Sequence, residues 1–162
     1  MSTESVEPFT LRAFRPELGA GVRDLIGRVY AEYGQVLELD TLDSDLLEIE
    51  ALYTAPHAFG VHVQDGRVLA TTAVKRTSDE RAELKRVFLD PDLRGRGHGR
   101  TLVDWSADRA RSAGARWLDI WTDVLFTRAH GLYAHLEARD TGRTRELGGR
   151  NAVVERHFEL EL

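Results

Sequence analysis

The chain has 162 residues, with 22 basic and 27 acidic side chains, a formal net charge of −5 and no cysteine. This length is typical of one domain whose core is large enough to fold without disulfides or metals. The lack of cysteine excludes disulfides, cysteine–metal sites and thiol nucleophiles. The acidic balance argues against nucleic acid as a partner, since such binding comes largely from neutralising phosphates.

Targeting signals are not visible in the sequence. No apolar run reaches the roughly 18 residues of a membrane span, and residues 1–8 lack the basic and apolar parts of a secretory signal. No Pro/Gly/Ser-rich linker divides the chain. We therefore expect a cytoplasmic protein without membrane contact, made of a tail over residues 1–8 and a single domain over residues 9–162.

The spacing of apolar residues changes from element to element along the first half of the chain. Alternation predicts a strand, helical spacing predicts two helices, and a strand–turn–strand pattern follows with a third strand after it. These elements are expected over residues 9–14, 19–34, 43–53, 58–63, 67–74 and 82–89. Asp65-Gly66 supplies the hairpin turn.

The second half alternates helices and strands. The expected elements are a helix from a glycine-rich loop to about residue 112, a strand over 115–122, a helix over 126–138, and strands over 143–147 and 152–161. A meander combined with strand–helix crossovers predicts an α/β fold with a mixed central β-sheet flanked by helices.

The most informative segment is the loop Arg94-Gly95-Arg96-Gly97-His98-Gly99, which follows a strand and opens a helix. Glycines let a backbone approach a ligand closely. Successive N–H groups beside a helix N-terminus form an anion-binding concavity, and the arginines of the loop add positive charge. The loop therefore predicts a phosphate or pyrophosphate site.

Two common phosphate motifs do not match this loop. A dinucleotide fingerprint beginning at Gly95 would need glycine where Arg100 stands, and the G-K-[ST] triplet of a P-loop is missing. By contrast, Arg94-x-x-Gly97-x-Gly99 resembles the acetyl-CoA signature [RQ]-x-x-G-x-[GA] of the GNAT acyltransferase superfamily. The order of the elements around the loop is similar to that family's from about Phe9 to Leu162.

The resemblance implies that acetyl-CoA is the co-substrate. In that family two strands splay apart, here those over 82–89 and 115–122, and the pantetheine bonds the backbone of the first strand. The loop amides and the first helical turn would hold the pyrophosphate. The implied cofactor-binding residues are Val87, Phe88, Leu89, Arg94, Gly95, Arg96, Gly97, His98, Gly99, Arg100, Thr101 and Phe126.

Three residues are candidates for the chemistry. Tyr133 matches the family's tyrosine, whose hydroxyl protonates the leaving thiolate; a core tyrosine on an apolar stripe is the alternative. Glu83 lies where many relatives keep a catalytic glutamate and is a candidate base, with a solvated salt bridge as the alternative. His130 shares a helical face with Tyr133 and is a second candidate base, unless it is a surface histidine. No metal is expected.

The chain departs from the family pattern near Tyr133. Relatives often carry Gly-Phe or Gly-Tyr four or five residues after the tyrosine, where this chain has Glu137 and Ala138. An asparagine that relatives often have seven residues before the tyrosine is replaced by Phe126. Phe126 is therefore expected to pack on the pantetheine.

The acceptor site is implied between the first helices and the last hairpin, with Glu32, Tyr33 and Asp123 as candidate substrate-binding residues. The acidic segment from Glu32 to Glu50 would attract a cation such as a polyamine, an aminoglycoside or a protein amine; a solvated helix face is the alternative. The arginines at positions 128, 139, 143 and 145 would instead suit a carboxylate, as in an amino acid.

The prediction is an enzyme that transfers acetyl from acetyl-CoA to a primary amine of a small molecule or peptide by direct attack. One alternative is a non-catalytic acyl-CoA-binding or regulatory module on the same fold. Another is transfer to a hydroxyl or from another acyl donor. A homodimer formed through the apolar residues of the C-terminal strands (Val153, Val154, Phe158, Leu160 and Leu162) is a further hypothesis.

Overall fold

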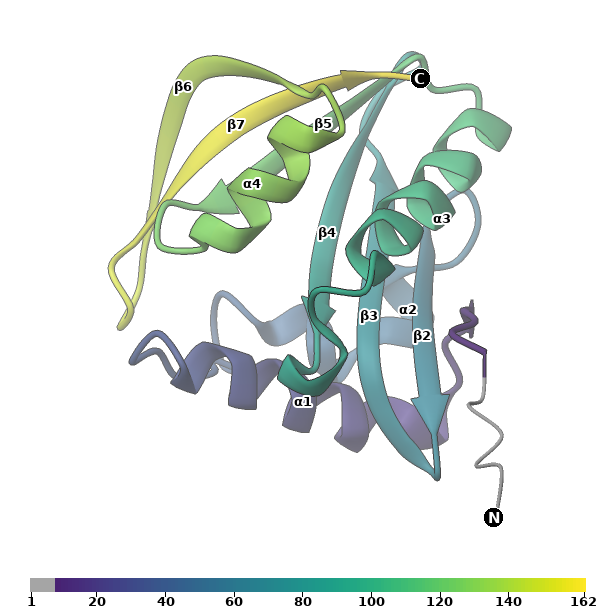
Figure 1. Ribbon diagram of the computed structural model, residues 1–162, viewed down its shortest axis with the longest axis vertical. Helices are drawn as coiled ribbons and strands as arrows, with labels where there is room; N and C mark the ends of the chain where they lie inside the picture. The colour runs from purple at the N-terminus through teal and green to yellow at the C-terminus, as the bar shows by residue number, and fades with distance from the viewer. Residues whose placement is uncertain (1–7) are drawn as a thin grey trace.

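The computed structural model describes residues 8–162, so most of the tail expected over 1–8 lies outside the described residues. One mixed sheet of seven strands runs through the molecule in the order β1-β2-β3-β4-β5-β7-β6 (Figure 1). The strands are β1 Arg12–Ala13, β2 Ala58–Gln64, β3 Arg67–Arg76, β4 Arg81–Leu89, β5 Trp117–Asp123, β6 Arg139–Gly148 and β7 Val153–Glu161. Neighbouring strands are antiparallel, except that β4 and β5 are parallel.

Helices cover the two faces of this sheet. They are α1 Gly19–Ala31, α2 Ile49–Leu52, α3 His98–Ser112 and α4 Thr127–His135. α3 and α4 lie on one face and α1 and α2 on the other (Figure 1). One apolar cluster, with Leu25 and Val61, fills the α1 side, and a second, with Leu118 and Tyr133, fills the α3–α4 side. None of the helices within residues 8–162 is long and apolar enough to span a membrane.

The pairing of β4 with β5 stops half-way along β4. Only Arg81–Leu84 of β4 pair with β5, opposite Trp117–Ile120. Within the part of the chain that the structure describes, residues 85–89 pair with β3 alone. The strands diverge from that point, which opens the sheet between its two halves.

The divergence follows a bulge at Arg86. Its backbone has φ +54, in the left-handed region that a side chain rarely adopts, and the register between β3 and β4 shifts beside it. The Thr71 hydroxyl donates to the Arg86 carbonyl oxygen at 2.7 Å. The Arg86 guanidinium forms ion pairs with Asp43 at 2.9 Å and Asp45 at 2.5 Å. Burial disfavours the charge, but Tyr30, Asp45 and Asp43 raise the pKa of Arg86 above its usual value.

The predicted fold class and element order are confirmed, but several bounds were wrong. The first strand is two residues long, and the helix expected over 43–53 is a 3-10 turn, Ser44–Leu47, followed by the single turn α2. The helix expected over 126–138 ends at His135, since Glu137 takes φ +64 and β6 begins at Arg139.

The apolar residues of the last strand belong largely to the molecule's own core. Phe158 is 3% exposed, and Leu160 and Leu162 pack against the cluster on the α3–α4 face. Val153, Val154, Leu160 and Leu162 are partly exposed, so the homodimer hypothesis stays a prediction.

Arg86→Met tests the bulge. The substitution keeps most of the side-chain volume but leaves Asp43 and Asp45 buried without their cation. We expect the free energy of unfolding to fall by about 3–5 kcal/mol, measured by urea denaturation. Arg76→Met is the matched control, because its partner Asp79 is fully exposed; a change below about 1 kcal/mol is expected there. Equal denaturation midpoints for the two variants would contradict the role given to Arg86.

Candidate active site

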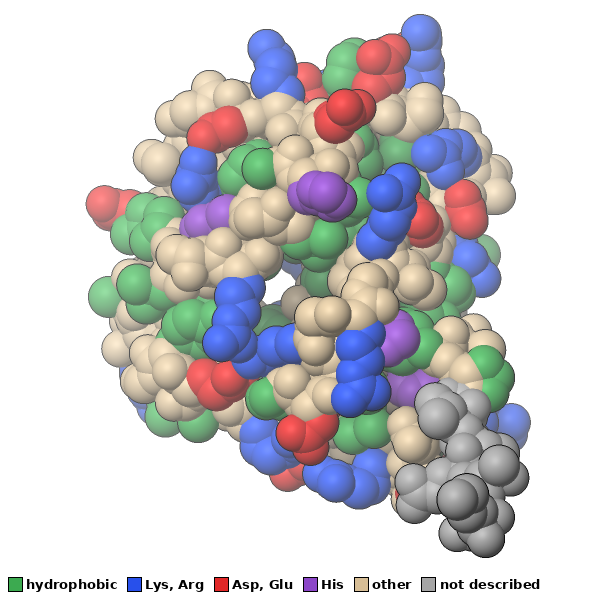
Figure 2. All heavy atoms as spheres, viewed as in Figure 1, with side chains coloured by type: hydrophobic (Ala, Val, Ile, Leu, Met, Phe, Trp, Pro, Cys, Tyr) green, Lys and Arg blue, Asp and Glu red, His purple; other side chains and the backbone are tan. Residues whose placement is uncertain are grey.

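Two cavities lie on either side of the divergence between β4 and β5. The first, called here the loop cleft, has a volume of about 780 Å³ and is lined by the glycine-rich loop, β4, α1 and α4. The second, called the acidic pocket, has about 170 Å³ and is lined mainly by β4, β5, the 35–43 loop and the β6–β7 hairpin. Val87, Phe88, Phe126 and Ala129 line both cavities, so the two meet there. Figure 2 shows the molecule hollowed near the middle of one face, beside Lys and Arg side chains.

The loop cleft presents unused backbone donors. The N–H groups of Gly95, Arg96 and Gly97 donate to no acceptor within residues 8–162, and the first turn of α3 follows directly. Gly95 and Gly97 have φ +78 and +82, and a Cβ on either would meet only open space. Such a run of N–H groups at a helix N-terminus binds anions, phosphates above all.

Gly99 has a different role from the glycines before it. A Cβ at this position would lie 2.9 Å from Cδ2 of Leu132. Glycine therefore lets the start of α3 pack closely against α4. The glycine-rich motif thus contains two glycines with positive φ, Gly95 and Gly97, and a third, Gly99, that permits a helix–helix contact.

Most of the predicted cofactor-binding residues line the loop cleft, but three do not. Those that line it are Val87, Phe88, Leu89, Arg94, Gly95, Gly97, Gly99, Arg100 and Phe126. Arg96, His98 and Thr101 lie outside its lining. His98 instead stacks on Phe9, with ring centroids 4.0 Å apart, and burial lowers its pKa.

The side chain of Arg94 forms an ion pair within the protein. Its guanidinium donates to both carboxylate oxygens of Glu32, at 2.7 and 2.8 Å, and this bond lowers the pKa of Glu32. The pair ties the end of α1 to the loop. Glu32 and Tyr33, expected in the acceptor site, line the loop cleft and not the acidic pocket.

Tyr133 lines the acidic pocket and is only 4% exposed. Burial is the cause that raises its pKa, so the phenol keeps its proton. No hydrogen bond of its hydroxyl is formed within the described residues, where every fully buried side-chain N or O atom has a partner. The unpaired hydroxyl must therefore open onto the pocket.

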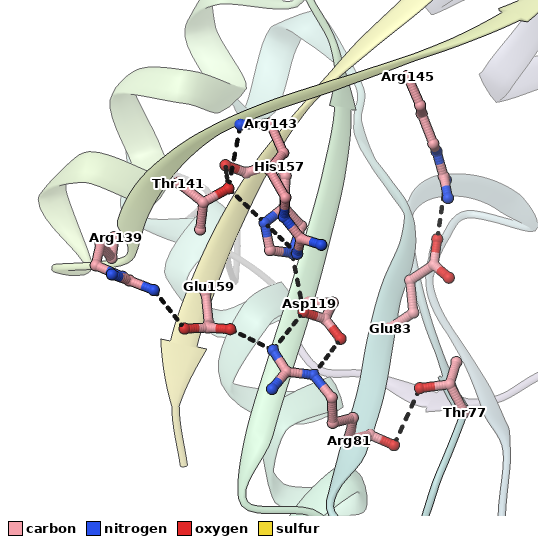
Figure 3. A network of polar contacts seen from close by, with 10 residues as sticks. All are labelled: Thr77, Arg81, Glu83, Asp119, Arg139, Thr141, Arg143, Arg145, His157 and Glu159. Carbon is pink, nitrogen blue, oxygen red and sulfur yellow. Dashed lines mark hydrogen bonds and ion pairs between the residues drawn. The ribbon is translucent and has the colours of Figure 1, made fainter.

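Glu83 also lines the acidic pocket, but it is not alone there. Arg145 donates to its Oε1 at 3.3 Å, and Lys85 Nζ lies 3.7 Å from the same atom. Figure 3 shows Arg145 reaching from β6 toward Glu83 on β4. Glu83 thus lies in the pocket, and it also forms the salt bridge that was the alternative to its role as a base.

Asp123 lies in the acidic pocket as expected, whereas most of the acidic segment does not form an open wall. Asp123 is 6% exposed and accepts from Gln35 Nε2 at 2.7 Å and from the backbone N–H of Leu125. Asp43 and Asp45 are used by Arg86. Glu38 is buried and accepts from the backbone N–H of Arg150.

His130 lies on α4 three residues before Tyr133, and both rings lie near Phe158, with ring centroids 5.9 and 5.7 Å from it, but His130 lines neither cavity. Its Nε2 lies 2.9 Å from the Asp123 carbonyl oxygen, and burial lowers its pKa. The ring thereby joins α4 to the end of β5.

A comparison with protein families now bears on this arrangement. The model of the Acetyltransferase (GNAT) family matches residues 22–137, well over half of the chain. The chain belongs to this family. The matched residues include helices on both faces of the sheet and the glycine-rich loop. The match ends before β6, so the β6–β7 hairpin, which forms one wall of the acidic pocket, lies outside the matched residues.

Individual GNAT relatives are distant. "Uncharacterized N-acetyltransferase YjgM" of Escherichia coli K12 is 27% identical over 118 residues, which cover 69% of this chain and 71% of the relative. "N-acetylaspartate synthetase" of Danio rerio is 31% identical over 75% of this chain. The chain spans about half of that relative, at 48%, and a fifth of "Uncharacterized N-acetyltransferase MJ1207" of Methanocaldococcus jannaschii, at 20%.

Solved structures share the fold. YncA of Salmonella typhimurium, solved with its cofactor acetyl-CoA, is 19% identical with a TM-score of 0.75 over 96% of this chain and 95% of that one. A GNAT-family acetyltransferase of Staphylococcus aureus Mu50 has a TM-score of 0.79 at 17% identity, over 96% and 99% of the two chains.

Sequence reasoning missed several residues of the loop cleft in this GNAT chain. Arg128, Leu132 and His135 of α4 line it. Their spacing of four and three places them on one helical face. That signal was present, but it became informative only once α4 was known to lie beside the loop.

Gly97→Ala tests the backbone requirement of the loop. The new Cβ meets no atom, so any cost comes from φ +82 alone. We expect a loss of about 1–2 kcal/mol in the free energy of unfolding, with a smaller loss for Gly97→Asn. Gly131→Ala, also in open space but inside α4, is the matched control and should stabilise the protein by about 0.5–1 kcal/mol. A stabilising Gly97→Ala would disprove the requirement.

Proposed function

We propose that this protein transfers an acetyl group from acetyl-CoA to a primary amine by direct attack, without a covalent enzyme intermediate. The observation that carries the proposal is the meeting of the two cavities at Val87, Phe88, Phe126 and Ala129. A thioester held in the loop cleft would there face an amine held in the acidic pocket. The absence of cysteine agrees with a direct transfer.

The residues of the loop cleft suit acetyl-CoA. The N–H groups of Gly95, Arg96 and Gly97 would hold the pyrophosphate, and the edge of β4 from Val87 to Leu89, released from β5, would accept the pantetheine as an additional strand. The cleft volume of about 780 Å³ is in the range of sites for extended ligands. Bound acetyl-CoA supplies the activated acyl group.

Tyr133 would act as the acid. The amine nitrogen bonds the carbonyl carbon, whose oxygen takes the negative charge; the carbon–sulfur bond then breaks, and the leaving sulfur takes a proton. Burial raises the pKa of Tyr133, so its hydroxyl carries a proton at neutral pH. A thiolate leaves fairly well unaided, so this step gives a moderate advantage. Backbone N–H groups near Val87–Leu89 would stabilise the oxyanion.

Glu83 is the base candidate that the geometry favours. The amine must lose a proton to attack, and the base must lie within hydrogen-bond reach of it or one water away. Glu83 lines the acidic pocket, whereas His130 does not. The name N-acetyltransferase of the Escherichia coli relative and the acetyl-CoA in the YncA structure support the same reaction class.

Thermal unfolding with acetyl-CoA tests the ligand of the loop cleft. At a hundredfold excess over Kd, binding adds about 2.7 kcal/mol to the free energy of unfolding. For a chain of this size the melting temperature should rise by roughly 5–10 °C. NADH and ATP serve as controls and should leave the melting temperature nearly unchanged. A shift with either control and none with acetyl-CoA would refute the assignment.

Tyr133→Phe separates catalysis from binding. We expect acetyl transfer, followed by thiol release, to slow by about 100-fold, while the acetyl-CoA-induced thermal shift stays close to that of the wild type. Tyr53→Phe is the matched control: its hydroxyl bonds Asp45, and the residue lines neither the loop cleft nor the acidic pocket. Full turnover by Tyr133→Phe would exclude the acid role, and a chain that binds acetyl-CoA without transfer to any amine would be a non-catalytic module.

A further inference from the structure

The acidic pocket already holds a cation that belongs to the protein. The guanidinium of Arg145, on the edge strand β6, lies 2.7 Å from Oε1 of Glu155 and 3.3 Å from Oε1 of Glu83. Its Cζ also lies 4.4 Å from the ring centre of Trp121, a cation–π distance. All four residues line the pocket. Two carboxylates and an aromatic face therefore form a built site for a planar or tetrahedral cation.

The charge of the pocket remains negative with Arg145 in place. Among the described residues, its lining has five carboxyl side chains against the basic side chains of Lys85, Arg86 and Arg145. Asp123 and Glu38 form no ion pair within residues 8–162, although they are only 6% and 2% exposed. A second cation would therefore be attracted to this pocket.

A second feature of the pocket, the hydroxyl of Tyr133, also points to a ligand that enters from outside. The hydroxyl of Tyr133, whose side chain is more than nine-tenths buried, opens onto the pocket without a partner among residues 8–162. The hydroxyl oxygen is reached from the pocket, since every fully buried side-chain N or O atom among these residues has a partner. The hydroxyl is thus poised for a group that enters from outside.

The arginines that could have bound a carboxylate are engaged elsewhere. Arg139 pairs with Glu159, and Arg143 lies against the ring of His157 (Figure 3). Arg128 lines the loop cleft. Arg145 is held by Glu155 and Glu83, so its charge is already balanced by carboxylates of the pocket. The structure therefore favours a cationic acceptor over an anionic one.

We propose that the acceptor is an unbranched amine with a second cationic group, and that this group binds between Glu155 and Trp121 in place of the Arg145 guanidinium. The proposal rests on the proposed acetyl transfer: the reacting nitrogen lies toward Glu83 and Tyr133, and the second cation lies toward Glu155. The Arg145 side chain is 36% exposed on an edge strand, so it can swing outward.

The dimensions and walls of the pocket agree with a linear diamine. A volume of about 170 Å³ admits a narrow chain. Leu42 and Leu147 line the pocket and are 37% and 39% exposed, so they offer an apolar wall at its mouth. In a linear diamine, the methylene chain would face these apolar walls and the two ammonium groups would face the carboxylates.

A series of α,ω-diamines and their matching monoamines tests the proposal. Each pair, such as 1,4-diaminobutane and 1-aminobutane, differs only in the second ammonium group. The best diamine should exceed its monoamine by at least about tenfold in kcat/KM for thiol release, with a ratio that falls as salt rises. Calorimetric binding of both amines to the protein saturated with CoA gives the same comparison without turnover.

Glu155→Gln should reduce the diamine-to-monoamine ratio toward one. Glu161→Gln, on the same face of β7 but outside both cavities, is the matched control and should keep the ratio. Arg145→Ala should tighten diamine binding several-fold, because it removes the internal competitor. If Arg145 instead bound a carboxylate of the acceptor, Arg145→Ala would weaken binding of the acceptor.

The outcomes separate the two proposals. Diamine binding that exceeds monoamine binding without any thiol release would support the cation site and refute the acetyl transfer. Thiol release with equal use of diamines and monoamines would support the transfer and overturn the cation site. Preference for L-aspartate, lost in Arg145→Ala, would likewise overturn it in favour of an anionic acceptor.

Discussion

The buried ion pairs of Arg86 with Asp43 and Asp45 are the interaction on which the site depends. They draw one residue of β4 toward the segment that follows α1, and they offset the cost of its left-handed backbone. The bulge lies two residues after Leu84, where the pairing of β4 with β5 stops. A regular ladder would continue to the end of both strands and would close the space in which both cavities meet.

One break in the sheet thus has two consequences. The released edge of β4 faces the loop cleft on one side, where α3 presents backbone donors, and the acidic pocket on the other, where Tyr133 opens. Because the same residues wall both cavities, two ligands can meet without a moving domain. The junction of the two cavities therefore depends on the geometry of a single strand.

The C-terminal hairpin gives this chain the part of its site that the family match does not include. The face of β5, β6 and β7 away from α3 and α4 carries a layer of linked charges, in which Asp119 accepts from Arg81 at 2.7 Å and lies 2.9 Å from Nε2 of His157 (Figure 3). Single pairs of this kind contribute little. As a network they fix β7 beside β5 and so position Glu155 and Trp121 at the pocket.

The sequence by itself determined the element order, the glycine-rich loop, the family, and Tyr133 and Glu83 as residues to examine, because periodicity, turns and short motifs are local properties of the chain. Tertiary structure decided which charges remain available. Arg94 pairs with Glu32, 62 residues away, and Glu83 with Arg145, also 62 residues away, whereas His130 turns to a backbone carbonyl. Such partners are chosen by packing across strands and helices that are distant in sequence, so local patterns could name the charged residues but not the pairs that they form.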